Sequence, residues 1–397
     1  MSQEAKNQHL LYRQLTPLQQ KQRLKELASV FFQLGAIAFG GPAAHIALMN
    51  DEVVKRRQWL SNEQLLDLLG VTNLLPGPNS TELAIHIGYE RAGWRGLLVA
   101  GSCFILPAML IVWLLAAIYV RYQTVPQVEW LLYGIKPVII AIVVQALWNL
   151  GKKALKDIPT TVVGLGVIGG YIFGLNELLL LLLAGITVML VKNLGRSQGR
   201  FEGALLLPIS GILAQSSNSL VTSPSWQSVF LFFLKIGSVL YGSGYVLLAF
   251  LQRDLVERSG WLTSQQLLDA VAIGQFTPGP VFTTATFIGY LLAGNAGAIA
   301  GTIGIFLPAF ALVFVVNPWV PKLRSSSWFG GILDGVNAAS LGLMAAVTYT
   351  LGQAALIDWL TILLALISTI IVFRFQINSA WLVLAGGLIG LFTHTIA

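Results

Sequence analysis

The chain has 397 residues, of which 55% are hydrophobic and only 10% are charged. A soluble domain carries about 25% charged residues, so this composition excludes a soluble monomer. Two uncharged stretches, 96–119 and 296–320, each exceed the roughly 20 apolar residues that a helix needs to cross a hydrocarbon core. The composition therefore predicts a polytopic, all-α membrane protein embedded in a lipid bilayer.

Several function classes are excluded by the same inspection. The net charge of +7 comes from basic residues scattered in short loops, which is the pattern of cytoplasmic loops rather than of a nucleic-acid surface. The sequence has no GxxxxGK[ST] motif for ATP and no Cys/His cluster for a metal, and its single cysteine, Cys103, excludes an intramolecular disulfide. We therefore expect no cofactor and no metal. Residues 1–27 are polar and amphipathic without the apolar core of a cleavable signal, which predicts a cytoplasmic tail.

The second half of the chain repeats the first. WLSNEQLLD in the first half corresponds to WLTSQQLLD in the second, and PGP tripeptides lie at 76–78 and 278–280, at an offset of 202 residues. One residue is then lost, and LPA at 106–108 matches 307–309 at an offset of 201. Ordered identities at nearly one offset indicate a duplication. The predicted parts are a tail (1–27), a first repeat (28–191), a linker with a short crossing segment (192–229) and a second repeat (230–397).

The charge pattern predicts how the two repeats are oriented. Lys and Arg number 18 in residues 1–203 and 6 in residues 204–397. The loop that carries Lys152, Lys153 and Lys156 corresponds to a loop without any basic residue in the second repeat. Because basic loops stay in the cytoplasm, the two repeats are predicted to cross the membrane in opposite directions. Such inverted-topology repeats are common in transporters.

Each repeat is predicted to begin with two Gly/Pro-broken segments, followed by four spans. In the first repeat the broken segments cover 28–56 and 65–90, with breaks at GGP (40–42) and PGP (76–78). Proline inside a helix removes a hydrogen bond and clashes with the preceding turn, so these segments are predicted to be re-entrant helical hairpins, with kinked spanning helices as the alternative. The further expected elements are spans near 96–118, 130–150, 159–173 and 178–191, a crossing segment near 203–215, hairpins near 230–251 and 265–290, and spans near 297–316, 330–351, 359–373 and 379–394.

The helices that restart after these breaks are candidate anion sites. Irregular backbone at membrane depth is tolerated only where it is buried in protein or lines an aqueous cavity. A restarting helix aims unpaired N–H groups and the positive end of its dipole at that place, which favours an anion. Hydroxyl and amide side chains there can cap the helix and can also donate to oxyanion oxygens. The candidate binding residues are Gly40, Gly41, Pro42, Pro76, Gly77, Pro78, Asn79, Ser80, Thr81, Pro278, Gly279, Pro280, Thr283 and Thr284.

The motif AFGGPxAHI (38–46), followed by WLS and by LLPGPNSTELAIHIGY (74–89), resembles the chromate ion transporter (CHR) family in its long two-domain form. The resemblance covers nearly the whole chain, and the first-half motif is long and unusual. It implies efflux of chromate, with sulfate as a structural analogue. His45, within the first motif, is a further candidate binding residue. The second half departs from the pattern where Asn79 becomes Val281, so the two repeats are not expected to bind equally.

Ionisable residues inside the predicted helices are further candidates, because each costs roughly 3 kcal/mol or more at the bilayer centre. Lys136 and Lys235 either extend to the interface or provide a counter-charge for the oxyanion. Glu82 lies one turn into the first restarted helix. There it either carries a coupled proton or pairs with His86, four residues further along the same helix face.

The leading hypothesis is a bacterial inner-membrane transporter that exports chromate or a sulfate-like oxyanion without ATP hydrolysis and confers chromate resistance. The alternative is an uptake permease for sulfate or a related oxyanion. A membrane enzyme is disfavoured, because the sequence offers neither a nucleophile–base set nor a metal cluster. The sequence leaves open the coupling ion, the stoichiometry and whether the chain forms a homodimer.

Overall fold

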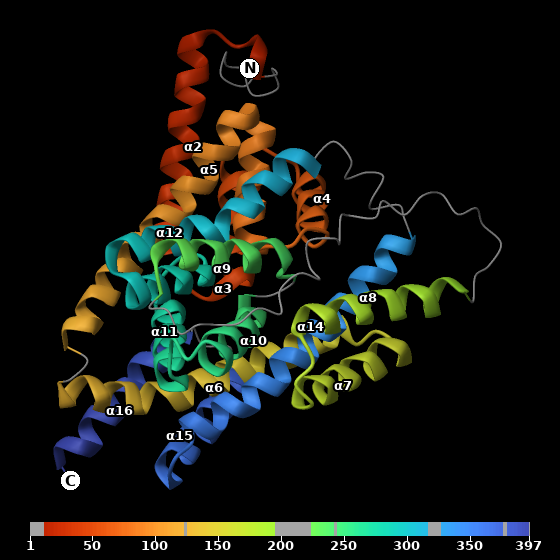
Figure 1. The fold of residues 1–397 in the computed structure, drawn as a ribbon. Helices are drawn as coiled ribbons and strands as arrows, with labels where there is room; N and C mark the ends of the chain where they lie inside the picture. Colours follow the sequence, from red (N-terminus) through yellow and green to blue (C-terminus); the bar gives the residue numbers. More distant parts are fainter. Residues whose placement is uncertain are drawn as a thin grey trace.

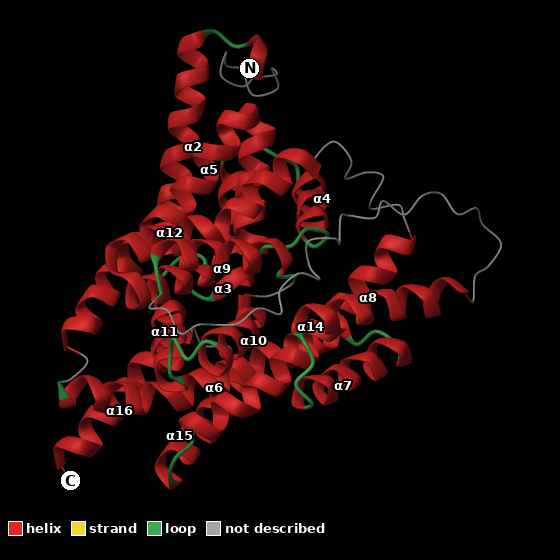
Figure 2. Ribbon diagram, in the orientation of Figure 1, coloured by secondary structure: helices red, strands yellow, loops and turns green. Residues whose placement is uncertain are grey.

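The computed structural model describes residues 12–122, 125–194, 224–241, 244–316, 327–375 and 379–396, and within these ranges every regular element is a helix (Figure 2). The predicted all-α class is therefore confirmed, whereas the expected crossing segment near 203–215 lies outside the described residues. Among the described residues, four helices are long and apolar enough to cross a membrane: Asn79–Tyr122, Pro126–Ala154, Val281–Val316 and Trp328–Ala355.

The two repeats contain matching series of helices. The first consists of α2 (Pro17–Ile37), α3 (Gly41–Met49), the π-helix η2 (Asn50–Arg56), α4 (Asn62–Thr72), α5 (Asn79–Tyr122), α6 (Pro126–Ala154), α7 (Ile158–Ile172) and α8 (Glu177–Leu194). The second consists of α9 (Trp226–Val239), η4 (Gly244–Val246), α10 (Leu247–Phe250), the π-helix η5 (Leu251–Arg258), α11 (Ser264–Phe276), η6 (Val281–Thr283), α12 (Thr284–Val316), α14 (Ser327–Ala355), α15 (Trp359–Phe375) and α16 (Ser379–Ile396).

The duplicated WLS and WLT motifs mark the starts of α4 and α11. Ser61 caps α4 by accepting a hydrogen bond from the Gln64 N–H, and the Gln64 side chain bonds back to the Ser61 N–H. Thr263 and Gln266 form the same capping box at α11. A hydroxyl at the cap with Gln three residues later satisfies two backbone donors at once, which explains why both repeats carry this spacing.

The breaks inside the long helices are also duplicated. Ala92 and Gly93 interrupt α5 at φ/ψ of −147/24° and 60/−149°, and Ala293 and Gly294 interrupt α12 at −144/28° and 59/−145°. The positive φ favours glycine at the second position of each pair. Equivalent sequences therefore adopt equivalent backbone conformations about 200 residues apart.

The repeats are interlaced rather than placed side by side. In Figure 1, α2–α5 lie with α9 and α12 towards the N-terminal end of the molecule, and α6–α8 lie with α14–α16 at the other end. α6 packs against α15 and α16 of the second repeat, and α14 packs reciprocally against α7 and α8 of the first. Reciprocal contacts of this kind are those of an approximate twofold relation. The orientation of that axis relative to the membrane, and hence the inverted topology and the re-entrant hairpins, stay predictions.

Small residues allow these crossings to be close. A Cβ atom added to Gly134 would lie 2.0 Å from the Gly386 carbonyl oxygen, and one added to the equivalent Gly335 would lie 2.3 Å from the Ala184 carbonyl oxygen. Glycine at such positions lets helix backbones approach directly, as is usual between membrane helices. An ion-pair cluster also joins the repeats: Lys192 lies 2.6 Å from Asp157 and 2.8 Å from Asp334. The hydrogen bond from the Lys192 ammonium lowers the pKa of the Asp157 carboxyl.

Candidate functional site

The PGP tripeptide of each repeat is bonded to the helix break of the other repeat. The Gly77 N–H donates to the Leu240 carbonyl oxygen at 2.8 Å, and the Gly279 N–H donates to the Ala38 carbonyl oxygen at 2.8 Å. Ala38 and Leu240 are the equivalent residues that end α2 and α9. Both tripeptides interrupt their helices, and four chain breaks therefore meet in one region. Here the N–H groups of the two central glycines lie outside the helices and donate to carbonyl oxygens of the opposite repeat, which a buried backbone N–H requires.

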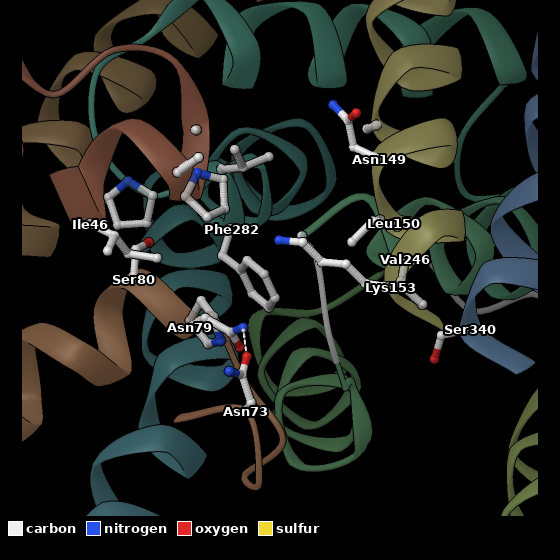
Figure 3. Close-up of a pocket in the computed structure, with 18 of the residues that line it drawn as sticks. Ile46, Asn73, Asn79, Ser80, Asn149, Leu150, Lys153, Val246, Phe282 and Ser340 are labelled. Atoms are coloured by element: carbon white, nitrogen blue, oxygen red, sulfur yellow. Dashed lines mark hydrogen bonds between the residues drawn. The ribbon is translucent and has the colours of Figure 1, made fainter. Parts of the chain in front are cut away.

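A cavity of about 450 Å³ lies beside these breaks (Figure 3). Its walls come from both repeats, namely the first-repeat breaks, the run 280–282, and the facing sides of α6 and α14. The predicted binding residues that line it are Gly40, Gly41, Pro42, Pro78, Asn79, Ser80 and Pro280. The predicted residues that do not line it are His45, Pro76, Gly77, Thr81, Lys136, Lys235, Pro278, Gly279, Thr283 and Thr284.

One cationic side chain, Lys153, stands among the described residues that line the cavity. It extends from the end of α6 into the cavity, with Asn149 one turn before it (Figure 3), and within the described part of the chain no carboxylate pairs with it. Gln145, Asn149 and Lys153 all line the cavity and are spaced four residues apart, so they form one polar stripe on the helix. The equivalent positions of α14 carry Ala, Thr and Ala, so the stripe belongs to the first repeat alone.

Sequence reasoning assigned Lys153 to a basic loop that sets membrane orientation, and it missed this stripe. The signal that could have found it is the polar spacing at 145, 149 and 153 in an otherwise apolar helix. A charged or amide side chain that recurs every fourth residue on a membrane helix faces the protein interior or an aqueous cavity.

The first restarted helix offers polar side chains to the same cavity. The Asn79 Nδ2 donates to Asn73 Oδ1 at 2.9 Å. Ser80 Oγ lies 3.1 Å from His45 Nδ1, and His45 Nε2 lies 3.1 Å from the Ala38 carbonyl oxygen. Because a carbonyl oxygen only accepts, Nε2 carries the hydrogen, and in the neutral imidazole Nδ1 accepts from the Ser80 hydroxyl. His45 therefore positions Ser80 from behind the cavity wall instead of facing the cavity itself.

The second restarted helix presents a different surface. The Thr283 hydroxyl donates to the Pro280 carbonyl oxygen at 2.8 Å, and the Thr284 hydroxyl donates to the Val281 carbonyl oxygen at 2.8 Å. Both hydroxyls thus serve the local backbone. Val281 and Phe282 line the cavity and give it an apolar wall.

Lys136 and Lys235, which were candidate counter-charges for the anion, are paired with carboxylates of the protein. Lys136 Nζ lies 3.1 Å from Asp269 Oδ1, and the Tyr119 hydroxyl donates to Asp269 Oδ2 at 2.8 Å. Lys235 Nζ lies 3.1 Å from Asp254 Oδ2. Neither lysine lines the cavity. Their charges are therefore balanced within the protein.

Glu82 and His86 do not form the pair that their spacing suggested. Both are buried, and neither Glu82 oxygen nor either His86 ring nitrogen has a hydrogen-bond partner among the described residues. The Glu82 carboxyl turns back towards the PGP turn, because a Cβ atom added to Gly77 would lie 2.4 Å from Glu82 Oε1. Helical side chains lean towards the N-terminal end of their helix, which carries this carboxyl away from a histidine one turn further on. Thr81 Oγ1 is likewise buried without a partner in the described part of the chain.

The described residues that line the cavity are amides, hydroxyls, one lysine and apolar groups, without a carboxylate, histidine or thiol. In the same part of the chain, no group of three or more His, Cys, Asp or Glu side chains is arranged to hold a metal ion. Donor groups around a single positive charge are suited to an anion with several acceptor oxygens.

Comparison with known proteins agrees with this chemistry. The family model described as chromate transporter matches residues 25–189 and again 227–391. A probable chromate transport protein of Synechococcus elongatus is 32% identical over 87% of this chain and 89% of its own. Chromate transport proteins of Cupriavidus metallidurans and Pseudomonas aeruginosa are each 30% identical, over 94% and 92% of this chain and 94% and 91% of their own. No solved structure matches the chain.

Proposed function

Because this chain belongs to the chromate transporter family, we propose that it is a secondary transporter that exports chromate from the bacterial cytoplasm across the inner membrane and so confers chromate resistance. The observation that carries this proposal is the cavity of about 450 Å³, in which one lysine, amide groups and the start of α5 surround the same space. The sequence has no phosphate-binding motif for ATP, so the proposed export does not use ATP hydrolysis.

The cavity can hold a tetrahedral oxyanion by dividing its oxygens among different donors. The Lys153 ammonium supplies a charge-assisted hydrogen bond, and the first N–H groups of α5, at Asn79 and Ser80, supply the positive end of a helix dipole. Phe282 on the opposite wall limits access of water and strengthens these contacts. One lysine does not neutralise a dianion, and this keeps binding weak enough for release, as conduction or transport requires.

The arrangement supports loading from the cytoplasm. Lys153 lies at the basic end of α6, which the positive-inside rule assigns to that side. The pair Lys136–Asp269 would then close the opposite side of the same pathway. Its repeat-equivalent residues are Asn337, which lines the cavity, and Asp67, which is exposed. The two equivalent places therefore differ in this conformation, a difference that supports alternating access between the two repeats.

Energetics favour export over uptake. An elementary charge that crosses 100 mV is worth about 2.3 kcal/mol, so a dianion that leaves an inside-negative cell gains roughly 4.6 kcal/mol per 100 mV. Uptake of the same anion would need two or three coupled cations to offset that gain. Among the described residues, Glu82 is a fully buried carboxylate without a hydrogen-bond partner, and it could carry one of these coupled cations. Sulfate uptake through the same cavity is the alternative.

Flux in oriented membrane vesicles tests the direction. Chromate should accumulate in inside-out vesicles with an inside-positive potential and should not accumulate in right-side-out vesicles under the physiological potential. Cells that carry the protein should retain less chromate than cells without it, with sulfate as a competitor to measure selectivity. Potential-driven accumulation in right-side-out vesicles would instead support the uptake permease.

A further inference from the structure

Glu82 differs from two other deeply buried carboxylates among the described residues. Its side chain is 0% exposed, and neither of its oxygens is hydrogen-bonded to any described residue. Asp269 and Glu177 are buried to a similar extent, but they lie 3.1 Å from Lys136 and 3.1 Å from Arg253, respectively. Of these three carboxylates, Glu82 is therefore the one without a cationic side chain beside it.

The surroundings of Glu82 leave it no partner for a negative charge. Its carboxyl packs on the turn at Gly77, and Tyr241, a neutral phenol that brings no positive charge, lies near it from the second repeat. His86 on the same helix is buried without a partner among the described residues, and His45 on α3 has both ring nitrogens engaged elsewhere. An ionised carboxylate enclosed in this way is strongly disfavoured, and such a group takes up a proton instead. The enclosure of Glu82 therefore favours its neutral form.

The position of Glu82 connects that proton to the anion. Asn79 and Ser80 line the cavity, and Glu82 follows them within the first turn of α5. An ionised Glu82 and an oxyanion at this helix start would repel each other, so the bound anion favours the protonated form of Glu82. By linkage, the anion raises the proton affinity of the site and the proton raises its anion affinity by the same factor.

We infer that Glu82 binds one proton together with the oxyanion, so that the transported unit carries one negative charge instead of two. On the loading side the carboxylate takes up a proton and becomes a carboxylic acid. On the other side the turn at Gly77 moves, water reaches the carboxyl, and the proton leaves with the anion. The stretch of the second repeat at 281–289 contains no carboxylate, so the duplication supplies no second group equivalent to Glu82. This inference rests on the proposed function.

The charge of the transported unit can be measured directly. The purified protein is reconstituted into liposomes in buffer alkaline enough for free chromate to be the dianion, with a tenfold chromate gradient, and the membrane potential at which net flux stops is determined. A unit with one charge stops at about 59 mV, and a unit with two charges stops at about 30 mV. We expect the first value for the wild type and the second for Glu82→Gln, which copies the neutral acid but cannot release a proton. A tenfold proton gradient should shift the wild-type value by about 59 mV and leave the variant unchanged.

Glu90→Gln is the matched control, because Glu90 is an exposed carboxylate two turns further along the same helix; it should behave as the wild type. A wild-type value of about 30 mV that ignores the proton gradient would overturn the coupling and leave chromate transport standing. Absence of any chromate flux in the wild type would overturn the proposed function itself. The pH response of the wild type shows whether a proton accompanies the anion, and loss of that response in a Glu82→Gln variant that still transports chromate assigns the proton to Glu82. A response retained in that variant would mean that hydrogen chromate carries the proton, and it would overturn the role of Glu82.

Discussion

Two adjacent lysines on α6 have different surroundings and therefore different expected roles. Lys153 lines the cavity, whereas Lys152 lies over the Trp148 ring at 5.1 Å from its centre, on the border of a separate, largely apolar groove. We expect Lys153→Met to lower the initial rate of chromate transport about tenfold or more, since one lost charge-assisted contact is worth about 1.4 kcal/mol or more. The Lys152→Met variant should transport chromate at an initial rate within about twofold of the wild type. Equal losses in both variants would mean that the lysines act on membrane orientation instead of binding.

The two restarted helices allow a second matched comparison. Asn79 lines the cavity with its amide, whereas the Thr283 hydroxyl is bonded to the Pro280 carbonyl oxygen at 2.8 Å. Asn79→Val should therefore lower transport roughly tenfold at equal membrane abundance. Thr283→Val should lower it much less, with its main effect on thermal stability. A larger transport loss at Thr283 would show that the second repeat also holds the anion.

The PGP turns are expected to tolerate no side chain at their central glycine. Gly77 and Gly279 have φ of 144° and 87°, and a Cβ atom on Gly279 would lie 2.6 Å from the Ala108 Cβ. Gly77→Ala and Gly279→Ala should each cost about 2 kcal/mol or more, from backbone strain and overpacking together. The loss should appear as a lower midpoint of thermal unfolding in detergent. Gly352→Ala is the control, because nothing lies within 4 Å of a Cβ atom there, and it should be neutral or slightly stabilising.

The ion pair between α6 and α11 is expected to be cooperative. Lys136→Met would leave the Asp269 carboxylate buried beside Tyr119 without its cation, and breaking a buried pair in this way costs about 3–5 kcal/mol. The double variant Lys136→Met/Asp269→Asn should recover most of that loss, because it removes both charges. Thermal unfolding of the two single variants and the double variant measures the coupling. Additive losses would mean that the two side chains do not stabilise each other.

The opposite orientation of the two repeats can be tested with equivalent residues. Glu63 near the start of α4 and Gln265 near the start of α11 are both exposed and are related by the duplication. In a Cys103→Ser background, Glu63→Cys and Gln265→Cys should react with a membrane-impermeant maleimide from opposite sides of sealed vesicles. Reaction of both from the same side would contradict the inverted topology. As a control for folding, each variant should transport chromate at the wild-type rate.

At the scale of the whole molecule, the sequence alone predicts only those features that depend on a local pattern of residues. Apolar runs, the GGP and PGP breaks and the 202-residue offset indicate helices, interruptions and the duplication. Contacts between distant segments cannot be read in this way. The partner of Lys136 lies on α11 of the other repeat, and the role of Lys153 depends on which face of α6 meets the breaks. Even on one helix, the suggested pair of Glu82 and His86 does not form, because spacing does not show which way a side chain leans.

The hydrogen bond that joins the first PGP turn to the opposite repeat also sets an order on synthesis. Gly77 cannot meet its acceptor until Leu240 has been made, roughly 160 residues later. At about 5–20 residues per second, the ribosome needs roughly 8–30 s to add them. Through that interval the nascent first half carries a turn whose N–H lacks its permanent partner, and in the predicted re-entrant hairpin lipid offers no substitute. We therefore expect the insertion machinery to keep the Gly77 N–H hydrogen-bonded or away from lipid until Leu240 of the second half is in place.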